Sequence, residues 1–306
     1  MQMRSLGSLQ VTVVGLGCNN FGGRLDEARS TDVVHAALDA GINFFDTADI
    51  YGATRSEVLL GQALGPRRGE VVVATKFGMP IDDDHFGAHP DYVRQACEDS
   101  LRRLGTDYID LYQLHYPDDT VPIDDTVAAL HELIAAGKVR EIGCSNFNPE
   151  QLRDARRAAG DGPGFVSVQN QYSLLAREPE HDGVLETCDE LGLGFLPFYP
   201  LANGLLTGKV RPGEPIPEGT RLAMMTPERS AHWLGEDLQR RVGALITYAG
   251  EIETPLLNLA FSWLLSHHQV SSVIAGATSA EQVDANAHAV LSLGPDVIEA
   301  LDELAQ

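Results

Sequence analysis

The sequence predicts an α/β protein of the (β/α)8 barrel class, the TIM barrel, and three observations favour that fold. Short apolar runs alternate with longer amphipathic segments along the whole chain of 306 residues, and unbroken βα alternation is typical of a parallel sheet. Eight such units occur at this length, which favours a closed barrel over an open sheet. No third glycine follows Gly15-Leu16-Gly17, so the glycine-rich turn of a two-domain dinucleotide-binding fold is missing. We therefore expect one barrel domain over residues 1–306.

The eight strands are expected where short apolar runs end in glycine or a polar residue. In chain order these runs are Val11–Gly15, Ile42–Phe45, Val71–Ala74, Ile109–Leu114, Glu141–Cys144, Phe165–Val168, Gly194–Tyr199 and Val270–Ile274. Helices are expected between them, because apolar residues recur there every three or four positions and glycines end the pattern. They are Thr31–Ala40, Ser56–Leu64, the helix opened by Pro90 and ended by Gly105, the helix that carries Val127, Leu130 and Ile134, the helix opened by Asn148-Pro149 with Gln151 three residues after its cap, Asp182–Leu191, Pro255–Ser266 and Ser279–Leu291.

Three insertions and a tail interrupt this regular pattern. Met1–Leu9, with the turn Leu6-Gly7-Ser8, predicts a hairpin that plugs the bottom of the barrel. Gly78–His89 is a polar loop. Ala202–His232, after the seventh strand, is long and rich in Pro and Gly, which indicates either a mobile cover or a surface excursion. A helical tail is expected at the C-terminus.

Composition excludes several classes of function. Lys plus Arg number 22 against 44 for Asp plus Glu, so the net charge is −22, and such a surface repels nucleic acids and anionic membranes. No apolar run is long enough to span a membrane, and the N-terminus lacks the apolar core of a signal peptide. The four cysteines are widely scattered, which predicts a cytoplasmic protein without a disulfide framework or a metal site. Any anionic ligand needs a local pocket of donors.

Four polar side chains follow the ends of strands two to four, where catalytic residues of a barrel lie. They are Asp46, Tyr51, Lys76 and His115. A phenol is a poor acid at neutral pH, but a lysine beside it lowers its pKa, and a carboxylate holds that lysine in place. A histidine opposite can donate a hydrogen bond to a carbonyl oxygen. Together the four predict protonation of a nascent alkoxide, although each alone also fits a structural role, such as a helix cap for Asp46.

Here the sequence resembles the aldo-keto reductase superfamily, along nearly the whole chain. Five ordered motifs carry the resemblance: Gly41-Ile-Asn-Phe-Phe-Asp-Thr-Ala-Asp-Ile-Tyr-Gly52, Val73-Ala-Thr-Lys76, Leu111-Tyr-Gln-Leu-His115, the pair Gly143-Cys-Ser-Asn-Phe147 and Val168-Gln-Asn-Gln-Tyr172, and Ile274-Ala-Gly-Ala-Thr-Ser-Ala-Glu-Gln282 with Asn286. The resemblance implies a barrel enzyme in which NADPH delivers a hydride to a substrate carbonyl. It also implies that Tyr51 donates the proton, tuned by Lys76 and Asp46, while His115 orients the carbonyl.

The same resemblance implies where the cofactor NADP(H) lies. Ser145, Asn146 and Gln169 would bind the nicotinamide carboxamide, and Phe198 stands where the family stacks an aromatic ring. Tyr199 replaces the serine that usually follows that ring. The other implied cofactor residues are Leu201, Asn203, Lys209, Gly276, Ser279, Gln282 and Asn286.

The resemblance gives conflicting signals about the choice of nucleotide. Many relatives have Lys and Arg where this chain has Gly276 and Gln282, which favours NADH. Ser279 and Gln282 match the segment of potassium-channel β subunits, where Ser and Gln contact the 2′-phosphate, although Ser-x-x-Gln is also an ordinary capping box. A helix N-terminus suits a phosphate in either case, and we therefore expect NADPH to be preferred over NADH.

Two other functions fit the same motifs. The chain also resembles the channel β subunits, which bind NADPH as redox-sensing partners, and the four catalytic candidates serve equally in a sugar or alcohol dehydrogenase that runs in the oxidative direction. In each enzymatic case the expected partner is a small carbonyl or alcohol substrate. The candidate walls of its pocket are Phe21, Met79, Phe86, Tyr116 and Phe147.

Overall fold

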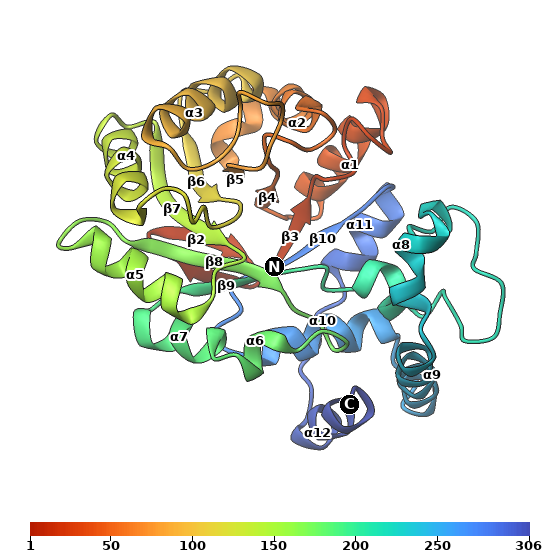
Figure 1. Ribbon diagram of the computed structural model, residues 1–306. Helices are drawn as coiled ribbons and strands as arrows, with labels where there is room; N and C mark the ends of the chain where they lie inside the picture. The colour runs from red at the N-terminus through yellow and green to blue at the C-terminus, as the bar shows by residue number, and fades with distance from the viewer.

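In the computed structural model, which describes residues 1–306, eight parallel strands form one sheet that closes on itself (Figure 1). In order around the sheet they are β10 (Val273–Gly276), β3 (Val14–Gly17), β4 (Phe44–Asp46), β5 (Val72–Phe77), β6 (Ile109–Leu114), β7 (Val139–Ser145), β8 (Phe165–Gln171) and β9 (Gly194–Phe198). The gap between β9 and β10 is bridged just before β10, where the Ser271 N–H donates to the Phe195 carbonyl at 2.9 Å. The predicted (β/α)8 barrel is thereby confirmed.

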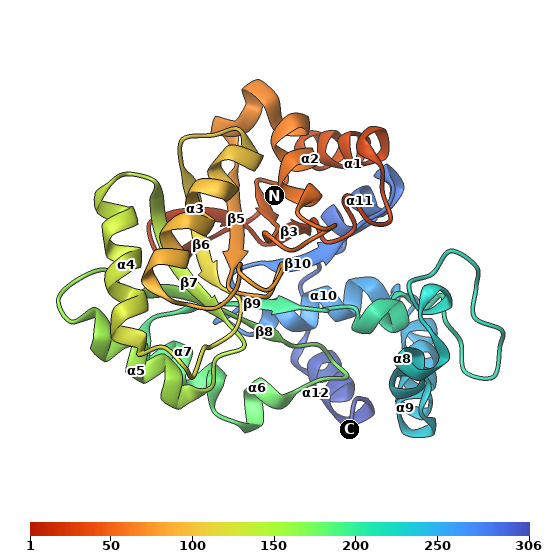
Figure 2. The same cartoon turned by 45° about the horizontal axis from the view of Figure 1, so that its top comes forward.

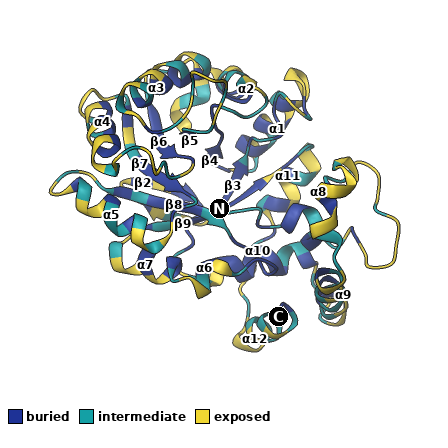
Figure 3. Ribbon diagram, in the orientation of Figure 1, coloured by how far each residue is buried: buried dark blue, intermediate teal, exposed yellow.

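Helices surround the strands, and their inner faces supply the outer layer of the core. The helices of the ring are α1 (Glu27–Asp39), α2 (Arg55–Leu64), α3 (Pro90–Leu104), α4 (Ile123–Ala135), α5 (Pro149–Ala159), α7 (Val184–Leu191), α10 (Leu256–Ser266) and α11 (Ala280–Ala287). Figure 3 shows buried strands within helices that expose only their outward faces. The capping box predicted for α5 is present, because the Asn148 side chain accepts from the Gln151 N–H while Gln151 accepts from the Asn148 N–H.

Two barrel strands begin later than their apolar runs predict. Residues Leu9–Thr12 (β2) pair with Met3–Leu6 (β1) in an antiparallel hairpin, so the first barrel strand begins only at Val14. Val270 belongs to the bridge with Phe195, so the eighth strand begins at Val273. In both cases hydrophobicity alone does not distinguish a barrel strand from the extended chain that leads into it.

The β1–β2 hairpin covers the bottom of the barrel, as its sequence predicts. Leu6, Leu9 and Val11 are buried, and they pack in one cluster with inward-facing residues of the strands, namely Phe44, Val72, Ala74, Leu111, Leu196 and Ile274. Arg4 fastens the hairpin to the end of α10 by donating to the carbonyl of Leu265 at 2.7 Å. The bottom of the barrel is therefore filled with side chains, and ligands have access from the opposite end.

The segment of residues 202–235, which we call the cover segment, joins β9 to α9 (Glu236–Glu251). It contains short helical turns at Ala202–Thr207, Leu222–Met224 and His232–Leu234, together with α8 (Pro227–Ala231). Figure 2 shows that it projects to one side of the ring of helices. The short α6 (Glu178–His181) and the tail helix α12 (Pro295–Leu304) complete the chain. None of the helices combines the length and the apolar character that a membrane crossing requires.

A buried carboxylate fastens three neighbouring strands near their N-terminal ends. Asp110 is fully buried, and it accepts from the Val73 N–H of β5 at 2.9 Å. It also pairs with Arg68 at 2.7 Å and with Arg140 of β7 at 2.8 Å. Both guanidinium groups lie over the Tyr108 ring, at 4.4 and 4.2 Å from its centroid. The cluster therefore compensates the buried charge with three donors.

We predict that Asp110→Ala lowers the free energy of unfolding by about 3–5 kcal/mol, because it leaves Arg68 and the Val73 N–H without their buried acceptor. Urea unfolding followed by circular dichroism measures this change. The matched control is Asp107→Ala, since Asp107 is exposed and its loss is expected to cost less than about 0.5 kcal/mol. Equal losses for the two variants would contradict a stabilising role for the cluster.

Candidate active site

A cleft of about 1400 Å³ opens at the C-terminal ends of the strands. Most of the residues predicted for a cofactor and a substrate line it: Asp46, Tyr51, Met79, His115, Tyr116, Ser145, Asn146, Gln169, Phe198, Tyr199, Leu201, Asn203, Lys209, Gly276, Gln282 and Asn286. Polar residues that follow parallel strands meet at one end of a barrel. Residues from the whole chain therefore lie in one site.

Asp46, the last residue of β4, lies at the base of the cleft with both carboxylate oxygens occupied. Its Oδ1 accepts from the Lys76 ammonium of β5 at 2.5 Å. Its Oδ2 accepts from the side-chain amides of Gln169 in β8, at 2.9 Å, and Gln113 in β6, at 3.3 Å. Lys76 donates a further hydrogen bond to the Thr47 carbonyl at 2.9 Å. The carboxylate therefore joins residues from four strands across the barrel.

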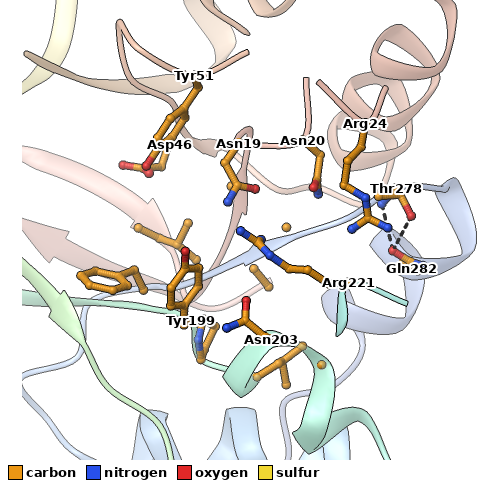
Figure 4. A pocket seen from close by; sticks show the side chains of 18 of the residues that line it. Asn19, Asn20, Arg24, Asp46, Tyr51, Tyr199, Asn203, Arg221, Thr278 and Gln282 are labelled. Atoms are coloured by element: carbon orange, nitrogen blue, oxygen red, sulfur yellow. Dashed lines mark hydrogen bonds between the residues drawn. The ribbon is translucent and has the colours of Figure 1, made fainter. Parts of the chain in front are cut away.

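Tyr51 lies above this ion pair, on the turn between β4 and α2. The Lys76 ammonium nitrogen is 5.2 Å from the centroid of the Tyr51 ring, and the His115 ring meets that ring edge-on, with 5.8 Å between centroids. Figure 4 shows Tyr51 and Asp46 close together at one end of the cleft. The structure therefore brings together the four side chains for which the sequence predicts proton transfer.

Burial dominates the protonation of this group. It raises the pKa of Tyr51 above the ordinary value for a phenol, although the charge of Lys76 opposes that rise. The sequence-based expectation of a lowered tyrosine pKa is therefore wrong in its net direction, because desolvation outweighs the lysine. Burial also opposes the Lys76 ammonium, but Asp46 and Tyr51 raise the pKa of Lys76 overall. Burial, helped by the charge of Lys76, lowers the pKa of His115 to about 3, so its imidazole is neutral at pH 7.

The polar residues at the ends of β7 and β8 are connected to each other and to His115. Ser145 donates to the Gln169 carbonyl at 2.6 Å. Asn146 has a left-handed backbone, with φ 63°, and its side-chain amide donates to the His115 carbonyl at 3.0 Å. These bonds fix the side chains before any ligand arrives, which is the arrangement that precise placement of a flat ring requires.

The backbone just after β9 is strained where it borders the cleft. Tyr199, Ala202 and Asn203 all have positive φ, of 51°, 44° and 55°. Such conformations cost about 1–3 kcal/mol each for residues other than glycine and cluster at functional sites. Asn203 lines the cleft, and its buried Oδ1 has no hydrogen-bond partner within the protein. This oxygen and the similarly unpartnered His115 Nδ1 leave polar atoms for a ligand to satisfy.

Five predicted site residues do not line the cleft. Lys76 is completely buried and reaches the site through Asp46, and Ser279 caps α11 by accepting from the Gln282 N–H at 3.4 Å. Phe21 and Phe147 are buried in the main core, and Phe86 is exposed on the loop after β5. Aromatic type alone predicts these three to be pocket walls, but their direction depends on loop paths.

Sequence analysis missed a group of cations in the cleft. Arg24, which follows β3, lines it together with Arg221 and Arg229 of the cover segment. Burial first, and then the charges of Arg221 and Arg29, lower the pKa of Arg24, so Arg24 and Arg221 lie close together. Asn19 and Asn20 also line the cleft, and the strand-end rule applied to the first strand identifies them.

Comparison with known proteins establishes the family. The sequence profile of the aldo/keto reductase family matches residues 13–306. This chain belongs to the aldo/keto reductase family. It is 35% identical to a probable voltage-gated potassium channel subunit beta of Oryza sativa subsp. japonica, over all of this chain and 97% of the relative, and 34% identical to the protein of that name in Arabidopsis thaliana, over the same shares. It is 35% identical to probable aldo-keto reductase 1 of Glycine max, over 90% of this chain and 80% of the relative.

Membership of the aldo/keto reductase family makes this protein an oxidoreductase by class, and members of the family use nicotinamide cofactors. The cleft fits such a group, since it offers unpartnered buried polar atoms at His115 and Asn203 and a cluster of cations in a chain of net charge −22. The local donors that an anionic ligand requires are therefore present.

A second buried carboxyl lies just behind the active site of this aldo/keto reductase. Asp49, on the turn that carries Tyr51, is fully buried, and neither carboxylate oxygen has a hydrogen-bond partner. Burial raises the pKa of Asp49 to about 7; the charge of Glu57 adds to this, while the charges of Arg103 and Lys76 oppose it. Its N–H donates to the Lys76 carbonyl at 3.0 Å.

We predict that Asp49 makes the protein less stable as pH rises from about 4 to 7. The folded state holds the Asp49 proton through this window and the unfolded state has already lost it, so the free energy of unfolding falls with pH. Asp49→Asn removes that dependence and is expected to stabilise the protein at pH 7.5 by on the order of 2–4 kcal/mol, with little change at pH 4. Urea unfolding at both pH values measures it, with the exposed Asp119→Asn as control. A pH dependence shared by wild type and Asp49→Asn would assign it to other groups.

Proposed function

We propose that this protein is an NADPH-dependent reductase that converts aldehyde or ketone carbonyls to alcohols, with Tyr51 as the proton donor. The observation that carries the proposal is the convergence of Tyr51, Lys76, Asp46 and His115 at one end of the cleft. A bound NADPH would supply the hydride. The protein must then hold the carbonyl carbon within reach and protonate the oxygen on which negative charge develops.

Tyr51 and Lys76 have different roles in the transfer of that proton. Burial keeps the Tyr51 phenol protonated at neutral pH, so it is ready to donate to an oxygen that becomes alkoxide-like. The phenolate left behind is stabilised by the ammonium of Lys76, whose charge is secured by Asp46. Because Lys76 is held from below by two acceptors, it stays in place through the change of charge.

His115 acts on the same oxygen as a neutral donor. Its lowered pKa excludes an imidazolium at neutral pH, so it does not compete with Tyr51 as the acid. A neutral imidazole N–H still donates a hydrogen bond, and this bond orients the carbonyl toward Tyr51. The two rings meet edge-on, which leaves room for one substrate oxygen to face both.

The remaining length of the cleft suits an extended dinucleotide. Ser145, Asn146 and Gln169 would hold the nicotinamide carboxamide, and Phe198 would stack on its ring. Along the rest of the cleft the residues proposed for the cofactor are Tyr199, Leu201, Asn203, Lys209, Gly276, Gln282 and Asn286. Gly276 packs closely against the loop after β3, because a Cβ there would lie 3.1 Å from the Asn20 side chain.

We assign the 2′-phosphate to Arg24, beside the start of α11. The loop that carries Arg24 is fastened to this region, since Asn20 donates to the Ala277 carbonyl at 3.2 Å. Figure 4 draws Arg24 at the same end of the cleft as Thr278 and Gln282. Gln282 itself accepts from the Thr278 N–H at 2.9 Å, so its side-chain oxygen is already engaged. A cation from the loop after β3 thus replaces the basic residues missing at positions 276 and 282.

A second candidate function is a cofactor-binding redox sensor. The rice and Arabidopsis relatives, which are named potassium channel β subunits, align with this chain over its whole length, and a reductase site fits both roles. Turnover decides between them: a sensor retains NADPH while reducing a broad panel of aldehydes negligibly. The same assay with alcohols and NADP⁺ tests the oxidative direction.

We predict that Tyr51→Phe lowers the rate of carbonyl reduction by about two to four orders of magnitude, the usual contribution of a general acid. Its affinity for NADPH should stay close to that of the wild type. NADPH absorbance measures turnover, and quenching of protein fluorescence measures binding. Near-normal turnover by Tyr51→Phe would remove Tyr51 from the mechanism.

Lys76→Met should also cause a large loss of rate and shift the basic limb of the oxidation pH profile upward.

We predict that Arg24→Gln raises the Michaelis constant for NADPH about tenfold, because a charge-assisted hydrogen bond to the 2′-phosphate is lost. The constant for NADH should change less than about twofold by the same argument. Arg29→Gln is the matched control, since Arg29 lies beside the same region, bound to the Thr278 carbonyl, but outside the cleft. An equal effect on NADH and NADPH would show that Arg24 acts through its bond to the Gly219 carbonyl instead.

A further inference from the structure

Tyr199 replaces the serine usual at this point of the family motif, and its ring joins two parts of the cleft. It lies directly after Phe198 on the strained turn that follows β9, with φ 51°. The two rings meet edge-on at 5.3 Å between centroids and 85° between planes. Because a left-handed backbone is costly for tyrosine, the surrounding structure has to hold this side chain in place.

The Tyr199 ring also contacts two residues of the cover segment. The Arg221 guanidinium lies 5.2 Å from its centroid, within the range of a cation–π interaction. The Trp233 ring meets it edge-on, with 6.5 Å between centroids. In Figure 4 the Arg221 side chain points away from Gln282 and toward Tyr199, in the middle of the cleft.

No other contact accounts for that direction of Arg221. Its guanidinium makes no hydrogen bond and no ion pair, although the neighbouring Leu222 is buried and anchors the backbone. The hydrogen bonds around Arg221 are local, as between the Met224 N–H and the Arg221 carbonyl, apart from that of Arg24 to Gly219. The Tyr199 ring is therefore the one partner of this cation.

We propose that Tyr199 is a positioning residue that holds the Arg221 guanidinium over the middle of the cleft, where it binds the pyrophosphate of the dinucleotide. This inference rests on the proposed function and assigns different parts of the cofactor to two arginines. Arg24 serves the adenosine end and sets the preference for NADPH, whereas Arg221 serves the pyrophosphate, which NADH and NADPH share. A serine at position 199 offers no face to the cation.

The test compares Tyr199→Leu with Tyr199→Phe. Leucine fills similar space without an aromatic face, while phenylalanine keeps the face and loses only the hydroxyl. For Tyr199→Leu we expect the dissociation constants of NADPH, NADH and ADP-ribose to rise by one common factor of roughly three to ten. Tyr199→Phe should stay within about twofold of the wild type by the same reasoning. ADP-ribose keeps the adenosine and the pyrophosphate but lacks the nicotinamide, so it reports the Arg221 region without any contribution from the ring that Phe198 would stack on.

A double-mutant cycle shows whether the ring acts through Arg221. In an Arg221→Ala background, Tyr199→Leu should have little further effect, because the cation that it positions is already gone. An undiminished effect there, tighter binding by Tyr199→Leu, or equal losses for Leu and Phe would overturn the proposal and leave the proposed function standing. Failure of the wild type to bind NADPH, NADH or ADP-ribose would overturn both. Urea unfolding of every variant separates a loss of binding from a loss of folding.

Discussion

The carboxylate of Asp46 is the constraint on which the rest of the site depends. A lysine buried at the base of the cleft keeps its charge only beside an anion, and Asp46 meets Lys76 at 2.5 Å. The same carboxylate accepts from Gln113 and Gln169, so every strand that contributes to this bond network is held at a fixed height. The ammonium also lies 5.2 Å from the centroid of the Tyr51 ring, and its charge adds to the burial that lowers the pKa of His115.

Charge is distributed in this protein at two scales with opposite signs. The whole chain is strongly acidic, with a net charge of −22, yet Lys209, Arg24, Arg221 and Arg229 gather at one cleft. Field lines concentrate where cations line a concave, low-dielectric surface. An anionic dinucleotide is therefore attracted locally, while the acidic exterior repels larger polyanions. The cations in the cleft therefore favour a small anionic ligand despite the acidic exterior.

Several positions of strained backbone border the cleft. Asn146, Tyr199 and Asn203 all adopt left-handed conformations, and all three line the cleft. Each is braced by rigid surroundings: Asn146 by the His115 carbonyl, and the turn after β9 by the buried Leu205 and Leu206 that follow it. A scaffold of packed strands and helices supplies the rigidity that such turns require.

The sequence by itself determined the barrel, its hairpin plug and the four catalytic candidates, because hydrophobic periodicity and the strand-end rule act locally. Only the tertiary structure decided what depends on loop paths and burial. Packing buries Phe21 and Phe147 in the core, and burial raises the pKa of Tyr51, which the lysine alone would lower. Packing also brings Arg24 and Arg221 together from segments far apart in the chain. The physical reason is that periodicity specifies which face of an element is buried, whereas desolvation and long-range contacts exist only after the elements have packed.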